Sequence, residues 1–205
     1  MHCLVIGNGE SRRGINLQNF PNHILVGCNA IHRDHPVDHL ICCDRRMVEE
    51  AIISDHTTNT KIYVRPEWFK YFRKIKKDKR INQVPDLPYE GNNKIDHPFH
   101  WGSGAYAILV AANLNPQSIT LIGFDLYPLK EKINNLYKGT NNYAPSKAKP
   151  VDSAYWVYQI SKVFNYFPNI EFNILNKEDW EIPKTWKYSN VKFNILATKN
   201  LTFTK

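Results

Sequence analysis

Short apolar runs alternate with amphipathic stretches along most of this chain. Each apolar run is about as long as an ordinary β-strand, and the stretches between them carry apolar residues at helical spacing. Such alternation predicts a parallel sheet whose connections are crossover helices. We expect strands at Cys3–Ile6, Ile24–Gly27, His39–Cys43, Lys61–Val64, Ile119–Ile122, Ile170–Ile174 and, at an edge of the sheet, Val191–Leu196.

The stretches between these runs predict four helices, at Met47–Ile53, Trp68–Lys77, Gly104–Asn113 and about Val151–Phe167. The third is small and apolar throughout, which suits burial against a sheet, and Pro168 ends the fourth. The pattern therefore predicts an α/β fold. We expect a single Rossmann-like domain over residues 1–205, with a mainly parallel sheet and helices on both faces.

One long stretch, about residues 127–150, lacks this regularity. It is rich in proline and asparagine and contains Tyr127, Tyr137 and Tyr143. A connection of this length inside a compact domain is usually functional or disordered. The three tyrosines favour a functional lid.

Composition narrows the class of protein. The chain is 42% hydrophobic and 22% charged, as in soluble globular proteins, and it has no apolar run long enough to span a membrane. Four cysteines lie in or beside the apolar runs without metal-ligand spacing, which predicts reduced, buried thiols and a cytoplasmic protein.

The net charge of +8 favours an anionic partner, whether a nucleotide, a sugar acid or nucleic acid. Much of the excess comes from Lys70–Arg80, where Tyr71 and Phe72 lie among the basic residues. A solvated helix face explains such a run. A nucleic-acid contact is the alternative.

Polar clusters follow the predicted strands. The carboxyl ends of parallel strands meet at one edge of a sheet, where ligands bind in α/β folds, so we expect these clusters to form a nucleotide site. Glycines let the backbone approach a ligand, and a helix start offers free N–H groups to phosphate. The clusters are Gly7-Asn8-Gly9, Cys28-Asn29, Cys43-Asp44, Gly123-Phe124-Asp125 and the helix start Ser103-Gly104.

Several of these residues also have structural explanations. Asn29 suits a turn in the left-handed conformation, Ser103 suits a helix cap, and Asp44 suits an ion pair with Arg45 or Arg46. For the general base we name Asp125 and His100. His100 also fits a phosphate-binding cation or a packed loop histidine. No histidine spacing predicts a metal site.

The order of motifs carries a family resemblance. It comprises Val-Ile-Gly-Asn-Gly-Glu-Ser at 5–11, Gly-Cys-Asn at 27–29, Gly-Ser-Gly-Ala-Tyr at 102–106 and Leu-Ile-Gly-Phe-Asp-Leu-Tyr at 121–127. This order resembles the bacterial sialyltransferases of glycosyltransferase family 42 over roughly residues 1–165. More broadly, the first turn is similar to that of pterin diphosphokinase-like Rossmann proteins. Over its full length the chain resembles uncharacterised proteins of tailed bacteriophages, which would place it in the host cytoplasm.

The sialyltransferase resemblance implies a cytidine monophosphate sugar donor and no essential metal. It also implies that the donor phosphate lies between the Gly7–Gly9 turn, the Ser103-Gly104 helix start and the lid tyrosines, Tyr137 and Tyr143 above all, with Tyr127 opening the lid. Asn8, Gly9, Asn29, Asp44 and Ser103 match positions that contact the nucleotide in that family.

The chain departs from that family at three positions. An Arg precedes the Ser-Gly helix start in the family, whereas His100 and Trp101 occupy this region here. Asp44 replaces an Asn, and Pro145 stands where the family has the lid His that acts as general base. The resemblance therefore supports nucleotide binding more than sialyl transfer.

The sequence thus predicts a nucleotide-dependent transferase, foremost a metal-independent glycosyltransferase that uses a nucleotide-activated sugar. One alternative is a diphosphotransferase acting on a small hydroxymethyl compound. That enzyme would hold Mg²⁺ between Asp44 and Asp125. The other alternative is a non-catalytic nucleotide- or nucleic-acid-binding protein.

Overall fold

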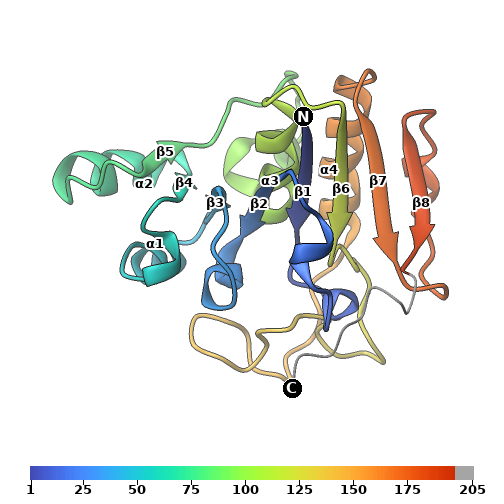
Figure 1. Ribbon diagram of the computed structural model, residues 1–205, viewed down its shortest axis with the longest axis horizontal. Helices are drawn as coiled ribbons and strands as arrows, with labels where there is room; N and C mark the ends of the chain where they lie inside the picture. Colours follow the sequence, from blue (N-terminus) through green and yellow to red (C-terminus); the bar gives the residue numbers. More distant parts are fainter. Residues whose placement is uncertain (197–205) are drawn as a thin grey trace.

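A computed structural model describes residues 1–196, which form an α/β fold around one sheet of eight parallel strands (Figure 1). The strand order is β5-β4-β3-β2-β1-β6-β7-β8, and every neighbouring pair is parallel. The strands are β1 His2–Ile6, β2 His23–Cys28, β3 His39–Ile41, β4 Lys61–Val64, β5 Ile81–Gln83, β6 Ser118–Ile122, β7 Glu171–Asn176 and β8 Val191–Ile195. The prediction of an α/β, mainly parallel fold is confirmed.

The central strands are apolar on both sides because helices cover both faces of the sheet. Cys3 and Val5 face one buried cluster, and Leu4 and Ile6 face the other. The helices are α1 Arg45–Ile52, α2 Pro66–Phe69, α3 Ser103–Ala112 and α4 Ala154–Tyr166. A π-helical turn, η5 Lys70–Ile75, continues α2.

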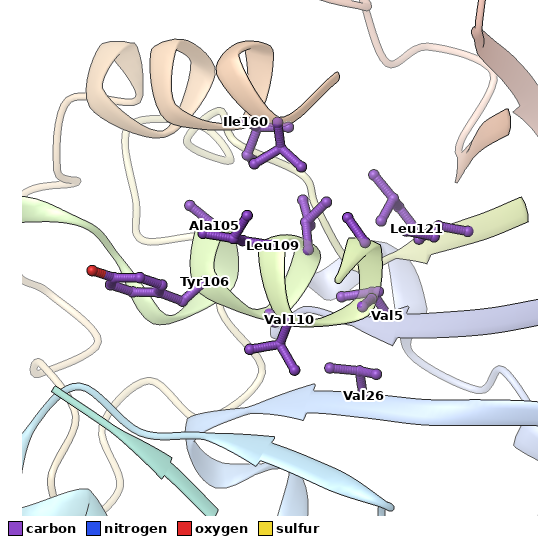
Figure 2. Close-up of a cluster of buried hydrophobic side chains, with 14 of the residues drawn as sticks. Val5, Val26, Ala105, Tyr106, Leu109, Val110, Leu121 and Ile160 are labelled. Carbon is purple, nitrogen blue, oxygen red and sulfur yellow. The ribbon is translucent and has the colours of Figure 1, made fainter. Parts of the chain in front are cut away.

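Helices α3 and α4 cover the first face (Figure 2). In that view Val110 of α3 points toward Val26 of the sheet, while Ile160 of α4 lies on the opposite side of α3. Every residue of α3 except Gly104 is buried, so this helix fills the space between sheet and α4. Its sequence is predominantly apolar and has no charged residue, which is the reason that it can lie so deep.

The second face is covered by α1, by Phe72 of η5 and by a short 3₁₀ helix, η3 Asn29–Arg33. Met47, Val48 and Ala51 are the buried residues of α1. The helix expected at Trp68–Lys77 is thus divided between α2 and η5.

The sequence predicted one of the two edge strands of the sheet. The run at 191–196 forms the edge strand β8, as predicted. The opposite edge, β5, was not predicted, because its sequence Ile-Asn-Gln has one apolar residue and no alternation to detect.

The order of the strands creates a switch point between β1 and β6. The chain runs outward from β1 to β5 and then returns to place β6 on the other side of β1. At such a reversal the connections leave the two strands in opposite directions, which opens a crevice at their carboxyl ends. The 127–150 segment lies beyond these ends of the strands (Figure 1).

Candidate functional site

A cavity of about 300 Å³ opens at the carboxyl ends of the central strands, at this switch point. Strands β1, β2, β3 and β6 and the start of α3 all contribute to its wall. Trp156 and Ile160 of α4 and Leu126 add apolar surface. Of the residues named from the sequence, it brings together Gly7, Asn8, Gly9, Asn29, Asp44, Ser103, Gly104 and Asp125.

The two glycines of the first turn are required by how closely β1 and β6 approach. The Gly7 N–H donates to Ile122 O at 2.8 Å and the Gly9 N–H donates to Gly123 O at 2.9 Å. A Cβ on Gly7 would lie 2.4 Å from Gly123 O, and one on Gly9 would lie 2.4 Å from the Asp125 carboxyl group. The turn therefore extends the β1–β6 pairing and places Asn8 at the cavity.

Asn8 and Asn29 each present an amide oxygen that has no hydrogen-bond partner within residues 1–196. Asn8 is 7% exposed, and its Nδ2 donates to Cys28 O at 3.2 Å and to the Tyr143 hydroxyl at 3.0 Å. Asn29 has φ +52°, so the turn explanation also holds for it. Buried unpaired acceptors are uncommon in folded proteins, and these two line the same cavity.

The start of α3 supplies hydrogen-bond donors. The first turn of a helix leaves its N–H groups without helical partners, and Ser103, Gly104 and Ala105 all line the cavity. The Ser103 Oγ accepts from the Cys43 N–H at 3.1 Å, which leaves its own proton available for a ligand. The N-cap is Gly102, one residue before Ser103.

Arg65 is a site residue that the sequence analysis did not single out. It follows β4, lines the cavity, and donates from Nη2 to Trp101 O at 2.9 Å. Its Nε is buried without a partner in the described chain. Arg65 thus places a cation beside the start of α3, where the sialyltransferase resemblance expects an Arg at a different point of the sequence. Its place directly after a predicted strand was the signal that could have found it.

Asp125 lies under the first turn, and it is 6% exposed. Its Oδ2 accepts from the Ser11 N–H at 2.9 Å, and its Oδ1 accepts from the Ser11 hydroxyl. Burial raises the pKa of the carboxyl group above its ordinary value, and the Ser11 hydrogen bonds oppose that rise. Asp125 therefore both holds the turn and lines the cavity.

Asp44 is the exposed residue before α1, and its carboxylate forms no ion pair in residues 1–196. Arg45 pairs instead with Glu49 at 2.8 Å, and Asp44 pairs with neither Arg45 nor Arg46 in this part of the chain, so the ion-pair explanation of Asp44 is wrong. Across the described chain, no group of three or more His, Cys, Asp or Glu side chains is arranged to hold a metal ion.

The lid tyrosines point into the protein. Tyr137 is 6% exposed; its hydroxyl accepts from Arg12 Nη2 at 2.6 Å and donates to Asp34 Oδ2 at 2.5 Å. The Tyr143 hydroxyl accepts from Asn8 Nδ2 at 3.0 Å and from the Ala30 N–H at 3.5 Å. Neither lines the cavity, so the structure does not place these hydroxyls where the expected donor phosphate would lie.

The middle of the lid is fixed to the body by hydrogen bonds of residues 136, 140 and 141. Leu136 N–H donates to Asn8 O at 2.8 Å, and Arg33 donates to Thr140 Oγ1 at 2.7 Å and to Asn141 O at 2.8 Å. The segment therefore covers the turn after β1 and the η3 helix, and only Asn134 and Asn135 of it line the cavity.

Two other predicted residues lie outside this cavity. His100 is partly exposed and contacts Phe99 edge to face with ring centroids 5.3 Å apart, as a packed loop histidine does. Burial of its ring and nearby Lys94 lower its pKa. Tyr127 lines a neighbouring cavity, described below.

Comparisons of this chain with protein-family models, with curated proteins and with solved structures gave no match. The likeness to sialyltransferases, pterin diphosphokinase-like proteins and phage proteins therefore stays a prediction from the motifs. No helix within residues 1–196 is long and apolar enough to cross a membrane.

Proposed function

We propose that the protein is a nucleotide-dependent transferase that binds a nucleotide-activated sugar in the switch-point cavity. The observation that carries this proposal is the convergence, in one cavity, of the α3 amides with the unpaired amide oxygens of Asn8 and Asn29. A ligand that satisfies both groups has an anionic part and a part with hydrogen-bond donors. Nucleotides have both, and the net charge of +8 favours an anionic ligand.

The phosphate would lie at the start of α3. There the free amides of Ser103–Ala105 and the helix dipole favour a negative charge, and Arg65 adds a full positive charge. The Ser103 hydroxyl donates a further hydrogen bond. This set stabilises a phosphate as it leaves the donor, which is the role that a metal ion or lid tyrosines have in other transferases.

The nucleoside would lie against Asn8 and Asn29. Their free oxygens accept from the exocyclic amine of cytosine or adenine, or from ribose hydroxyls, and Trp156 and Ile160 offer apolar contact. Uracil presents a carbonyl oxygen where cytosine has its amine. A site that uses the base amine therefore distinguishes cytidine from uridine nucleotides.

Asp125 is the residue that we assign as general base. It takes the proton of an acceptor hydroxyl, whose oxygen bonds to the anomeric carbon of the donor sugar. The bond from that carbon to the phosphate oxygen breaks, and its electron pair leaves with the phosphate. Burial raises the pKa of Asp125 above its ordinary value, which makes its carboxylate a stronger base.

The test is a thermal-shift and calorimetric titration of the intact protein with cytidine, uridine and adenosine monophosphates, and with adenosine triphosphate plus Mg²⁺. We expect cytidine monophosphate to raise the melting temperature and to bind at least about tenfold more tightly than uridine monophosphate. Tighter binding of adenosine triphosphate with Mg²⁺ would favour the diphosphotransferase. No response to any nucleotide would refute the proposal.

Two variants locate the site. Asn29→Gly removes an unpaired amide and is compatible with φ +52°, so it should weaken nucleotide binding without straining the backbone. Arg65→Gln should weaken binding of the phosphate by about tenfold or more. Lys74→Gln makes the same charge change at an exposed position of η5 and serves as the control. Equal losses in Arg65→Gln and Lys74→Gln would mean that only the net charge of the protein affects nucleotide binding.

Nucleotide binding without hydrolysis or transfer of any donor would indicate a non-catalytic protein.

A further inference from the structure

A second cavity, of about 370 Å³, adjoins the first at the carboxyl ends of β6 and β7. Asp125 and Asn134 line both cavities, so the two spaces share a wall. The rest of the second cavity comes from the turn after β1, the start of the lid and the segment that follows β7. Apart from Asp125 and Asn134, its residues do not line the nucleotide cavity.

Asn176, the last residue of β7, is the deepest polar group of this second cavity. It is 2% exposed, and its Oδ1 accepts from the Lys177 N–H at 2.8 Å, which fixes the orientation of the amide. The other end, Nδ2, is buried and has no partner within residues 1–196. A ligand oxygen is the group that would satisfy this donor.

Two aromatic rings form another part of the wall. Tyr127 and Trp180 have ring centroids 6.4 Å apart at an interplanar angle of 38°. The Trp180 Nε1–H donates to Asp125 O at 2.8 Å, so the indole is held by the strand end that separates the cavities. Aromatic rings held in this way offer an apolar face to a ligand.

Charged side chains complete the lining. Lys177 adds one ammonium group, but Glu10, Asp125, Asp179 and Glu181 outnumber it, and these carboxylates limit the kind of ligand. Asp179 and Glu181 are exposed at the mouth and form no ion pair in the described chain. They accept hydrogen bonds and repel a phosphate. A cationic ligand would leave Asn176 Nδ2 unsatisfied, because an ammonium group has no acceptor. A neutral ligand with several hydroxyl groups satisfies both the amide donor and the carboxylate acceptors.

We propose that this second cavity binds a neutral saccharide, with its C–H face on Trp180 and Tyr127 and a hydroxyl oxygen on Asn176 Nδ2. Binding of the saccharide stands on the cavity alone. Its role as the acceptor rests on the function proposed above: a hydroxyl that reaches Asp125 gives up its proton there, and its oxygen takes the anomeric carbon from the phosphate in the first cavity.

The experiment is saturation-transfer NMR of the intact protein with glucose, galactose, N-acetylglucosamine and lactose, each at roughly 10 mM, so that binding of millimolar affinity is also detected. Tetramethylammonium, which has no hydrogen-bond acceptor, serves as a cationic probe. We expect transfer to at least one sugar and none to tetramethylammonium. Transfer to tetramethylammonium alone, or to no sugar, would overturn the proposal.

Three variants test the assignment. Asn176→Asp keeps the acceptor for the Lys177 N–H and removes the free donor, Trp180→Leu removes the ring, and Tyr127→Leu is a milder change at the surface of the cavity. Each should weaken sugar binding about tenfold. Asn165→Asp, at an exposed position of α4, and Trp68→Leu, on α2, make the same chemical changes elsewhere and should leave binding within about twofold. Unchanged sugar binding in all three cavity variants would also overturn the proposal.

Nucleotide titration of the same variants separates the two proposals. Loss of sugar binding with normal nucleotide binding is the result expected for two distinct cavities. If sugars bind but no nucleotide does, the saccharide site stands and the transferase is refuted. If nucleotides bind and no sugar does, only the second cavity has been misassigned.

Discussion

Replacement of Gly9 by Ala tests why the first turn needs glycine. The backbone of Gly9 has φ −67° and ψ 152°, which alanine adopts readily, so the dihedral angles themselves cause no loss. The added Cβ would instead lie 2.4 Å from Asp125 Cγ and Oδ1, about 1 Å closer than carbon atoms normally approach. The Asp125 side chain would have to rotate away.

That rotation would break the two hydrogen bonds that Ser11 donates to the carboxylate. Hydrogen bonds to a charged group contribute about 1.5–3 kcal/mol each, and a buried carboxylate would remain without donors. Allowing for partial relaxation, we expect Gly9→Ala to lower the free energy of unfolding by about 3 kcal/mol. For a chain of this size the melting temperature should fall by roughly 6–12 °C.

The assay is urea denaturation of the wild type, Gly9→Ala, Asp125→Ala and the double variant. With Asp125 truncated the clash is gone, and Gly9→Ala should then stabilise the protein by about 0.4–1 kcal/mol because alanine restricts the unfolded chain. The reasoning fails if Gly9→Ala loses less than about 0.5 kcal/mol, or if the loss is the same in the Asp125→Ala background.

Three further predictions concern the lid and the thiols. Tyr137→Phe removes the hydroxyl between Arg12 and Asp34 and should lower the free energy of unfolding by about 2 kcal/mol while hydrogen exchange of residues 136–143 rises; unchanged exchange would contradict this anchor. The Arg33 guanidinium lowers the pKa of Glu50 below its ordinary 4.5, so the ion pair stabilises the protein above that value and its contribution is lost as the pH falls through the folded-state pKa. The protection factors of the amides at 140–142, which are corrected for the intrinsic exchange rate at each pH, should therefore fall on acidification in the wild type and change less in Glu50→Gln, and equal pH profiles would argue against this pair. All four cysteines are free and buried, and burial raises the pKa of each, so a thiol reagent at pH 8 should modify them only after denaturation; rapid modification of the native protein would show that a thiol is accessible.

The strands of the sheet interior were predictable because burial on both faces demands a continuous apolar run. Leu4 and Ile6 face one side and Cys3 and Val5 the other, so the whole run must be apolar. The edge strand β5 is less buried, so its residues need not all be apolar. Because Asn82 and Gln83 are polar, its sequence did not indicate a strand. A local pattern reveals a strand where helices cover both of its faces or where, as in β8, apolar and polar residues alternate.

The cavity was predictable for a related reason. A parallel sheet brings all strand ends to one rim, so Asn8, Asn29 and Ser103 could be grouped without knowledge of the strand order. Arg65 could have been grouped with them by the same rule. The positions of Tyr137 and Tyr143 could not, because they depend on long-range hydrogen bonds with Arg12, Asp34 and Asn8 that no periodicity records.

The switch point also has a consequence for biosynthesis. Strand β6 lies beside β1 at the switch point, and it is more than a hundred residues away along the chain: His2 pairs with Ser118, and Ile6 pairs with Ile122. A nascent chain therefore has no complete cavity until β6 and Asp125 have left the ribosome, and folding must close this long loop before the central pair forms. An N-terminal fragment that stops before β6 would carry the glycine turn but not the walls that make it a ligand site.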